Sequence, residues 1–216
     1  EFESSFVSVT GGIFEAEWIQ YQEEEPEEGN YVIAVDPAGF EAVEKERGVK
    51  GSALDETAIA VVKVTNDKWW VKDILHGRWH IKETANKILE AAIENEATTV
   101  GIEAGALKNA IIPYLEDEMR SSNRWVVITD VTHGGKKKAD RITWSLQGRL
   151  EHGKITFNKG RWNDDLEVQL LEFPTKGTHD DLIDALAYVD QVSVADFMGT
   201  VEIEDDWEPF DELAGY

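Results

Sequence analysis

The order of apolar strand-like runs and amphipathic helical segments is the feature that most constrains the fold of this chain. Three strand-like runs come first, and Asn66-Asp67 separates the second from the third as the turn of a hairpin would. Helical and strand-like segments then alternate, as they do in chains that build parallel sheets. The sequence therefore predicts an α/β fold, with a mixed central sheet of three antiparallel strands followed by parallel strands and with helices on its faces. The predicted strands are 31–35, 57–64, 68–75, 98–104 and 124–131, with a short extended piece at 154–157, and the predicted helices are 81–96, 106–120, 137–152, 163–173 and 179–197.

Composition narrows the class of protein. The 216 residues include no cysteine, which excludes disulfides and thiolate zinc sites and fits a reducing cytoplasm. No apolar run approaches the roughly 20 residues of a membrane span. The opening EFESSFVSVT lacks the basic and apolar regions of a secretory signal. We therefore expect no membrane partner, and a length sufficient for one sizeable core or two small ones.

Charge is unevenly distributed along the chain. The formal net charge is −23, yet residues 133–161 contain eight Lys or Arg against two acids. Such a basic window either contacts phosphates or forms a solvated helix face. Acidic runs at 23–28 and 202–212 indicate a solvated linker and tail.

Three aspartates crowd the start of the predicted helix 179–197. At about 100° per residue, Asp180, Asp181 and Asp184 share one edge of the helix, and apolar side chains fill the opposite arc. Capping explains the first two, because Thr178 and Asp181 have the spacing of a capping box and acids suit a helix N-terminus. Capping explains Asp184 poorly, since the effect of the helix dipole fades after the first turn. A metal site is the alternative.

Two further acids end predicted strands, Asp36 after the first and Glu103 at the end of the fourth. If these strands are neighbours, both carboxylates lie at one edge of the sheet, and the late helix can bring its aspartates to them. Converging carboxylates repel one another and persist when a divalent cation neutralises them. Oxygen ligands of this kind suit Mg²⁺ or Mn²⁺. Taken singly, Asp36 before proline also fits a turn, and Glu103 also fits an ordinary surface acid.

Two more residues stand where they could support such a site. Asp55 precedes the second strand, where it either caps the start of the hairpin or supports the metal ligands. His179 adjoins the aspartate cluster, where it is either a neighbour of the helix cap or a ligand.

Five stretches resemble the C-terminal nuclease domain of tailed-phage terminase large subunits, a family with a ribonuclease H-like fold. They are VIAVDPAG (32–39), LDETAIAVV (54–62), VGIEAGALKNAI (100–111), GGKKKADRI (134–142) and THDDLIDALAY (178–188). The resemblance implies a linker from an ATPase domain at 1–29, the nuclease domain at 30–197 and an acidic, flexible tail at 198–216. No G-x-x-x-x-G-K-[ST] phosphate loop occurs, so we expect the nuclease part without its motor.

The resemblance also implies an activity, which is two-metal hydrolysis of DNA phosphodiesters with Mg²⁺ or Mn²⁺. It assigns catalytic roles to Asp36, Glu103 and Asp181, and adds Asp184 and then Asp180 as further metal ligands. The biological task implied is to cut concatemeric viral DNA during genome packaging, in the cytoplasm of the infected host cell.

The basic window falls where this family places DNA. The resemblance assigns DNA binding to four residues, Lys136, Lys137, Lys138 and Arg141. The partners it implies are double-stranded DNA, the terminase ATPase domain, the small terminase subunit and the portal. Lysine contacts with phosphates position DNA without reading its sequence, and they weaken with salt.

Three other interpretations fit parts of the pattern. The nearest is another ribonuclease H-like nuclease, such as a junction resolvase or a transposase. An actin-like or sugar-kinase ATPase also places an aspartate after its first strand, but DPAGF offers no good Gly-rich phosphate turn. The third is a non-catalytic module that docks on a packaging motor.

Overall fold

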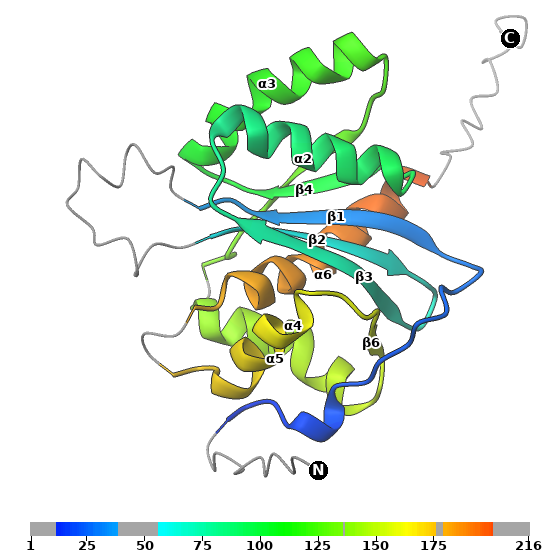
Figure 1. The fold of residues 1–216 in the computed structure, drawn as a ribbon, viewed down its shortest axis with the longest axis vertical. Coiled ribbons are helices and arrows are strands. Elements are labelled where there is room, and N and C mark those ends of the chain that lie inside the picture. The colour runs from blue at the N-terminus through cyan, green and yellow to red at the C-terminus, as the bar shows by residue number, and fades with distance from the viewer. Residues whose placement is uncertain (1–11, 39–55, 136, 176–178, 201–216) are drawn as a thin grey trace, which may run out of the picture.

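A six-stranded mixed sheet forms the centre of the protein (Figure 1). The computed structural model describes residues 12–38, 56–135, 137–175 and 179–200. The strand order is β5-β4-β1-β2-β3-β6. Neighbouring strands among β1, β2 and β3 are antiparallel, whereas β4 on β1, β5 on β4 and β6 on β3 are parallel. The predicted fold class, including the neighbouring positions of the first and fourth strands, is confirmed.

The boundaries of the elements differ from the predicted ones at a few ends. The sixth strand is the piece predicted only as extended, and it gains its hydrogen bonds by pairing beside β3. The last helix begins at Asp181 and continues to Thr200, into the segment expected to be tail. The elements are η1 (Ala16–Trp18), β1 (Asn30–Asp36), β2 (Thr57–Val64), β3 (Trp69–Gly77), α2 (Ile81–Glu94), β4 (Thr99–Glu103), α3 (Ala106–Ser122), β5 (Val127–Val131), α4 (Lys138–Glu151), β6 (Ile155–Phe157), α5 (Asn163–Glu172) and α6 (Asp181–Thr200).

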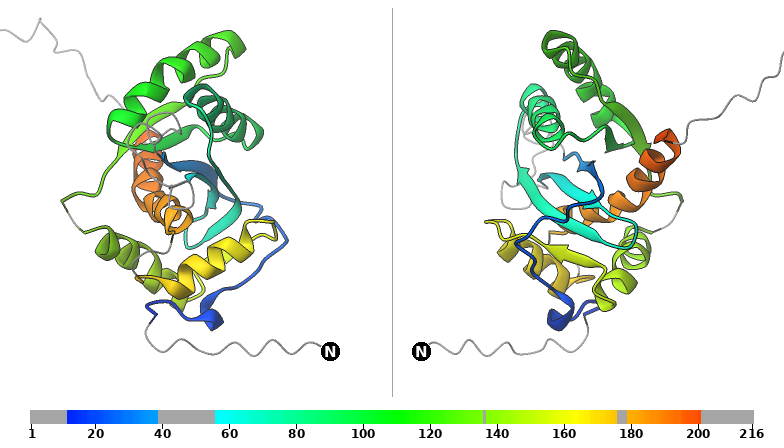
Figure 2. Two further views of the ribbon diagram at one scale, coloured as in Figure 1. Left: turned by 60° about the vertical axis from the view of Figure 1, so that its left-hand side comes forward. Right: turned by 90° about the vertical axis from the view of Figure 1, so that its right-hand side faces the viewer.

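Alternating residues of the central strands feed two separate cores, one on each face of the sheet. Ile33 and Val35 of β1 pack with α2 and α3, whereas Val32 and Ala34 face the layer of α4, α5 and α6. Figures 1 and 2 show these helix layers on opposite sides of the sheet. Because both faces are covered, the central strands read as nearly continuous apolar runs.

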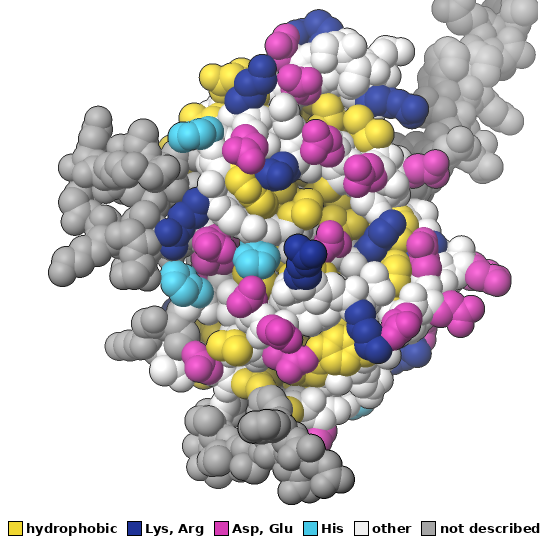
Figure 3. Space-filling view, in the orientation of Figure 1, with side chains coloured by type: hydrophobic (Ala, Val, Ile, Leu, Met, Phe, Trp, Pro, Cys, Tyr) yellow, Lys and Arg dark blue, Asp and Glu magenta, His cyan; other side chains and the backbone are white. Residues whose placement is uncertain are grey.

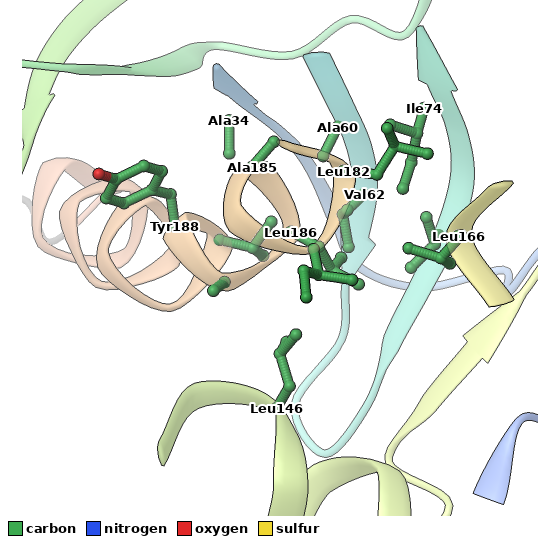
Figure 4. Packing of buried hydrophobic residues seen from close by; sticks show 14 of the residues in the cluster. Ala34, Ala60, Val62, Ile74, Leu146, Leu166, Leu182, Ala185, Leu186 and Tyr188 are labelled. Carbon is green, nitrogen blue, oxygen red and sulfur yellow. The ribbon is translucent and has the colours of Figure 1, made fainter. Parts of the chain in front are cut away.

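Helix α6 lies close against the sheet because the strands beneath it carry small side chains. It packs on β1, β2, β4 and β5. Ala34 and Ala60 face it from below, and Leu146 of α4 and Leu166 of α5 approach it from the other side (Figure 4). A Cβ added at Gly101 of β4 would lie 2.2 Å from Cγ2 of Val192, so glycine is required for this approach. The helix is therefore buried on nearly every side, as the apolar arc of its sequence predicted.

The N-terminal described segment completes the β6 edge of the sheet. The Gln22 N–H donates to the carbonyl of Phe157, and the Phe157 N–H donates to the carbonyl of Gln20. Phe14 is buried beside Phe173, with ring centroids 5.8 Å apart. Residues 12–22 thus pack on the domain, and their predicted link to an ATPase domain stays a prediction. No helix in the described part of the chain is long and apolar enough to cross a membrane.

We expect Gly101→Ala to destabilise the protein by roughly 1–3 kcal/mol, because the added methyl overpacks a core in which Val192 cannot move aside. Urea denaturation would measure the change. Gly148→Ala is the matched control: a Cβ added there, on the exposed side of α4, would meet no atom within 4 Å, and alanine should stabilise that helix by up to about 1 kcal/mol. Equal effects of the two changes would contradict the close approach of α6.

Candidate active site

The parallel pairing of β1 and β4 brings two acids into contact. Val35 pairs with Ile102, so Asp36 and Glu103, one residue further on, are neighbours at the same edge. Their carboxyl groups are hydrogen-bonded, and Asp36 is only 9% exposed. Burial and this hydrogen bond raise the pKa of Asp36 well above its usual value; the charges of Glu103 and Asp181 add to the effect, and Lys138 opposes it.

Asp181 opens helix α6 beside this pair, close enough for its charge to act on Asp36. It is 4% exposed, and its Oδ2 accepts a hydrogen bond of 3.0 Å from the backbone N–H of Glu56. His179 Nδ1 lies 3.7 Å from the same oxygen. Gln169 of α5 caps the helix, since its Oε1 accepts from the backbone N–H groups of residues 182 and 183. The first turn of α6 is thus fixed from two sides.

Asp184 and Asp180 contact cations that belong to the protein. Lys138 Nζ lies 2.8 Å from both Asp180 Oδ1 and Asp184 Oδ2. Arg141 forms an ion pair with the other oxygen of Asp184, and its guanidinium stacks 3.9 Å above the ring of Tyr188. Both partners of this pair are buried, with side-chain exposures of 7% and 2%. The geometry therefore gives Asp184, which capping could not explain, a buried ion-pair role.

Two residues of the site were missed by the sequence predictions. His133 Nε2 lies 2.7 Å from Glu103 Oε1, and the hydroxyl of Tyr188 is hydrogen-bonded to Glu103 as well. Burial raises the pKa of Tyr188, so its hydroxyl stays a donor. A signal for His133 was present in the sequence, because it follows β5, whose end meets the end of β4 at the same sheet edge. Tyr188 gave no such signal, since its position in the apolar arc indicated core alone.

The donor atoms present suit a hard divalent cation. Asp36, Glu103 and Asp181 offer carboxylate oxygens, and two touching carboxylates repel when both are ionised unless a proton or a cation lies between them. Within the described ranges, no three or more His, Asp or Glu side chains are grouped so as to hold a metal ion. Asp55 and Thr178, which the sequence also singled out, lie outside the described residues.

Much of the basic window is neutralised by acids from elsewhere in the fold. Besides Lys138 and Arg141, three of its cations form ion pairs: Arg149 with Asp190, Lys154 with Asp67 and Lys159 with Glu23. Lys137 is exposed just before α4, and Lys136 lies outside the described residues. Figure 3 shows acidic and basic side chains intermixed on the face in view. The predicted DNA contacts stay predictions, with Arg141 turned inward.

A family model described as the terminase RNaseH-like domain matches residues 33–189. The chain belongs to this family. The match spans both cores and every carboxylate of the candidate site. A search of curated proteins found no match.

Solved structures share the fold of this terminase domain at low sequence identity. The human cytomegalovirus terminase nuclease domain, soaked with Mn and inhibitor-bound, has a TM-score of 0.59 and 14% identity, covering 83% of this chain and 94% of that one. The large terminase nuclease of thermophilic phage G20c with bound zinc gives 0.54 and 13%, with 80% and 91% covered. The large terminase of a second thermophilic bacteriophage gives 0.56 and 11%; the match covers 84% of this chain but only 44% of that longer one.

We expect Arg141→Met to destabilise the terminase domain by about 3 kcal/mol, because it leaves the buried Asp184 carboxylate with Lys138 alone. Adding Asp184→Leu should recover most of the loss. Chemical denaturation would measure both. The control is Arg120→Gln, which breaks an exposed pair with Asp117 and should change stability by less than about 1 kcal/mol. A loss no larger than that of the control would show that the buried pair is not needed.

We expect Asp36→Asn to change the pH dependence of stability in metal-free buffer. The raised pKa means that the folded state binds this proton more tightly than the unfolded chain does, so the wild type loses stability as pH rises through that pKa. The amide variant has no such group. Thermal melts in EDTA between about pH 5 and about pH 8 should therefore favour the variant increasingly as pH rises. Parallel curves for the two proteins would contradict the raised pKa.

Proposed function

We propose that this domain is a metal-dependent endonuclease that hydrolyses DNA phosphodiesters. The observation that carries the proposal is the contact between Asp36 and Glu103 at the ends of two neighbouring parallel strands, with Asp181 beside them. Buried acids in contact destabilise a fold unless something neutralises them, and a divalent cation does so while serving catalysis. Membership in the terminase family supports a nuclease over other uses of a cation.

Asp36, Glu103 and Asp181 are the proposed metal ligands and catalytic residues. Bound Mg²⁺ or Mn²⁺, in a pair, would supply an activated water and stabilisation of the leaving 3′ oxygen. The solved relatives were studied with Mn, Mg or zinc, which is consistent with this ligand set. His133 and Tyr188 orient the Glu103 carboxylate through the hydrogen bonds they make to it.

Asp181 ranks ahead of the other aspartates of its helix as a direct ligand. Asp184 is held by Arg141 and Lys138, and Asp180 is held by Lys138. Either would have to exchange an ammonium or guanidinium partner for the metal. We propose that these two acids fix Lys138 and Arg141 near the site, where the cations limit the repulsion among the carboxylates.

Double-stranded DNA is the proposed substrate, held near the loop before α4. Lys136 and Lys137 are the proposed phosphate contacts. Few such contacts and a strongly acidic chain imply weak binding that falls further with salt. The domain would then act when the rest of a large terminase, with its ATPase domain, small subunit and portal, delivers concatemeric viral DNA in the infected host cell.

Cleavage of plasmid DNA tests the proposal. The wild type should nick and linearise plasmid with Mg²⁺ or Mn²⁺, and EDTA should stop it, because the carboxylates need the cation to act. Asp36→Asn, Glu103→Gln and Asp181→Asn should each fall to the EDTA level in gel assays.

The control for that assay is Asp117→Asn, which changes an exposed aspartate of α3 and should cleave as the wild type does. Cleavage that persists in EDTA would contradict the metal-dependent mechanism. Preference for four-way junctions over linear duplex would instead favour a junction resolvase, and absence of cleavage under all conditions would favour a docking module.

A further inference from the structure

A pocket of about 460 Å³ adjoins Asp181, separate from the contact between Glu103 and His133. It lies between the start of β2, the end of β3 and helix α5, and its polar lining includes Glu56, His76, Asp165 and Gln169. None of these residues carried a function in the sequence analysis. Their contacts form a connected path that ends at the Asp181 carboxylate.

The inner end of the path is a backbone hydrogen bond. The Glu56 N–H donates to Asp181 Oδ2 over 3.0 Å, which fixes one oxygen of the carboxylate. Glu56 immediately precedes β2, whose sheet pairing with β1 and β3 begins at residues 57 and 58. Its backbone is therefore outside the ladder, and a side-chain contact must hold it in place.

That contact comes from His76 of β3. His76 Nδ1 lies 3.0 Å from Glu56 Oε2, with side-chain exposures of 24% and 33%. An ionised carboxylate only accepts hydrogen bonds, so the Nδ1–H is the donor. On its other side, His76 Nε2 lies 3.5 Å from Oδ2 of Asp165, whose side chain is 62% exposed. The Glu56 contact is shorter and less solvated, and it is the stronger of the two.

Helix α5 supports the same carboxylate by a second route. Asp165 and Gln169 are four residues apart and so lie on one face of that helix. Gln169 caps the backbone just after Asp181, and Asp165 contacts the histidine that holds Glu56. The two routes converge on the orientation of one carboxylate.

We propose that His76 is a positioning residue: through Glu56, it holds the Asp181 carboxylate in the orientation that binds the divalent cation. The inference rests on the proposed function, since it concerns a ligand of the same site. His76 touches neither metal nor DNA in this scheme. Removing an outer contact of this kind typically lowers metal affinity by roughly 10–100-fold.

The test measures Mn²⁺ binding without DNA, by calorimetric titration of the domain. His76→Leu should weaken Mn²⁺ binding by about 10-fold or more. His76→Asn, whose amide nitrogen can take the place of Nδ1, should restore most of the affinity. In the metal-free protein, the Glu56 amide should exchange its hydrogen faster in His76→Leu than in the wild type, as followed by NMR, because Oδ2 of Asp181 no longer holds it steadily.

His152→Leu is the matched control, because in the described part of the chain this exposed histidine side chain is hydrogen-bonded to the backbone of its own helix, and the variant should bind Mn²⁺ as the wild type does. Unchanged Mn²⁺ affinity and unchanged Glu56 exchange in His76→Leu would overturn the inference, as would equal losses in the Leu and Asn variants. Asp36→Asn separates this outcome from failure of the proposed function. If that variant binds Mn²⁺ as tightly as the wild type, the metal site itself is wrong; if it does not, only the role of His76 is in question.

Discussion

The close packing of helix α6 on the sheet is the interaction on which the rest of the structure depends. The helix can approach because β1, β2 and β4 present alanine and glycine to it, and Val192 fills the space that a side chain at Gly101 would take. Its burial fixes the helix axis, and with it the position of its first turn above the ends of β1 and β4. Asp181, Asp184 and Tyr188 then reach the site from one rigid element. A site built on such an element is held more firmly than one built on loops.

Electrostatics at this edge is a balance between buried acids and cations that the protein supplies. Arg141 and Lys138 satisfy Asp184 and Asp180, while Asp36 and Glu103 share a hydrogen bond. This division separates aspartates that stabilise the fold from carboxylates left for a metal. It also explains how a chain of net charge −23 tolerates so many acids near one point.

The same balance changes the meaning of the basic segment between β5 and β6. Most of its described cations face acids of α6, of the hairpin or of the N-terminal segment. Ion pairs across elements join the α4 layer to the sheet, and exposed ones contribute little to stability. A nuclease domain with few unpaired cations depends on its partners to deliver DNA, which fits a domain that works beside a motor.

The sequence by itself determined the order of elements, the mixed sheet and the acids at its edge. Period-2 and period-3.6 patterns are local, and a strand that ends in Asp36 or Glu103 places that residue at a predictable edge once the two strands are neighbours. Tertiary structure alone decided which acids are paired. Asp180, Asp181 and Asp184 are chemically identical and close in sequence, and their roles differ because α4 and the start of β2 meet different sides of α6. The contacts of His133 with Glu103 and of His76 with Glu56 likewise join segments that no local pattern connects, since both depend on sheet register and helix packing across the whole domain.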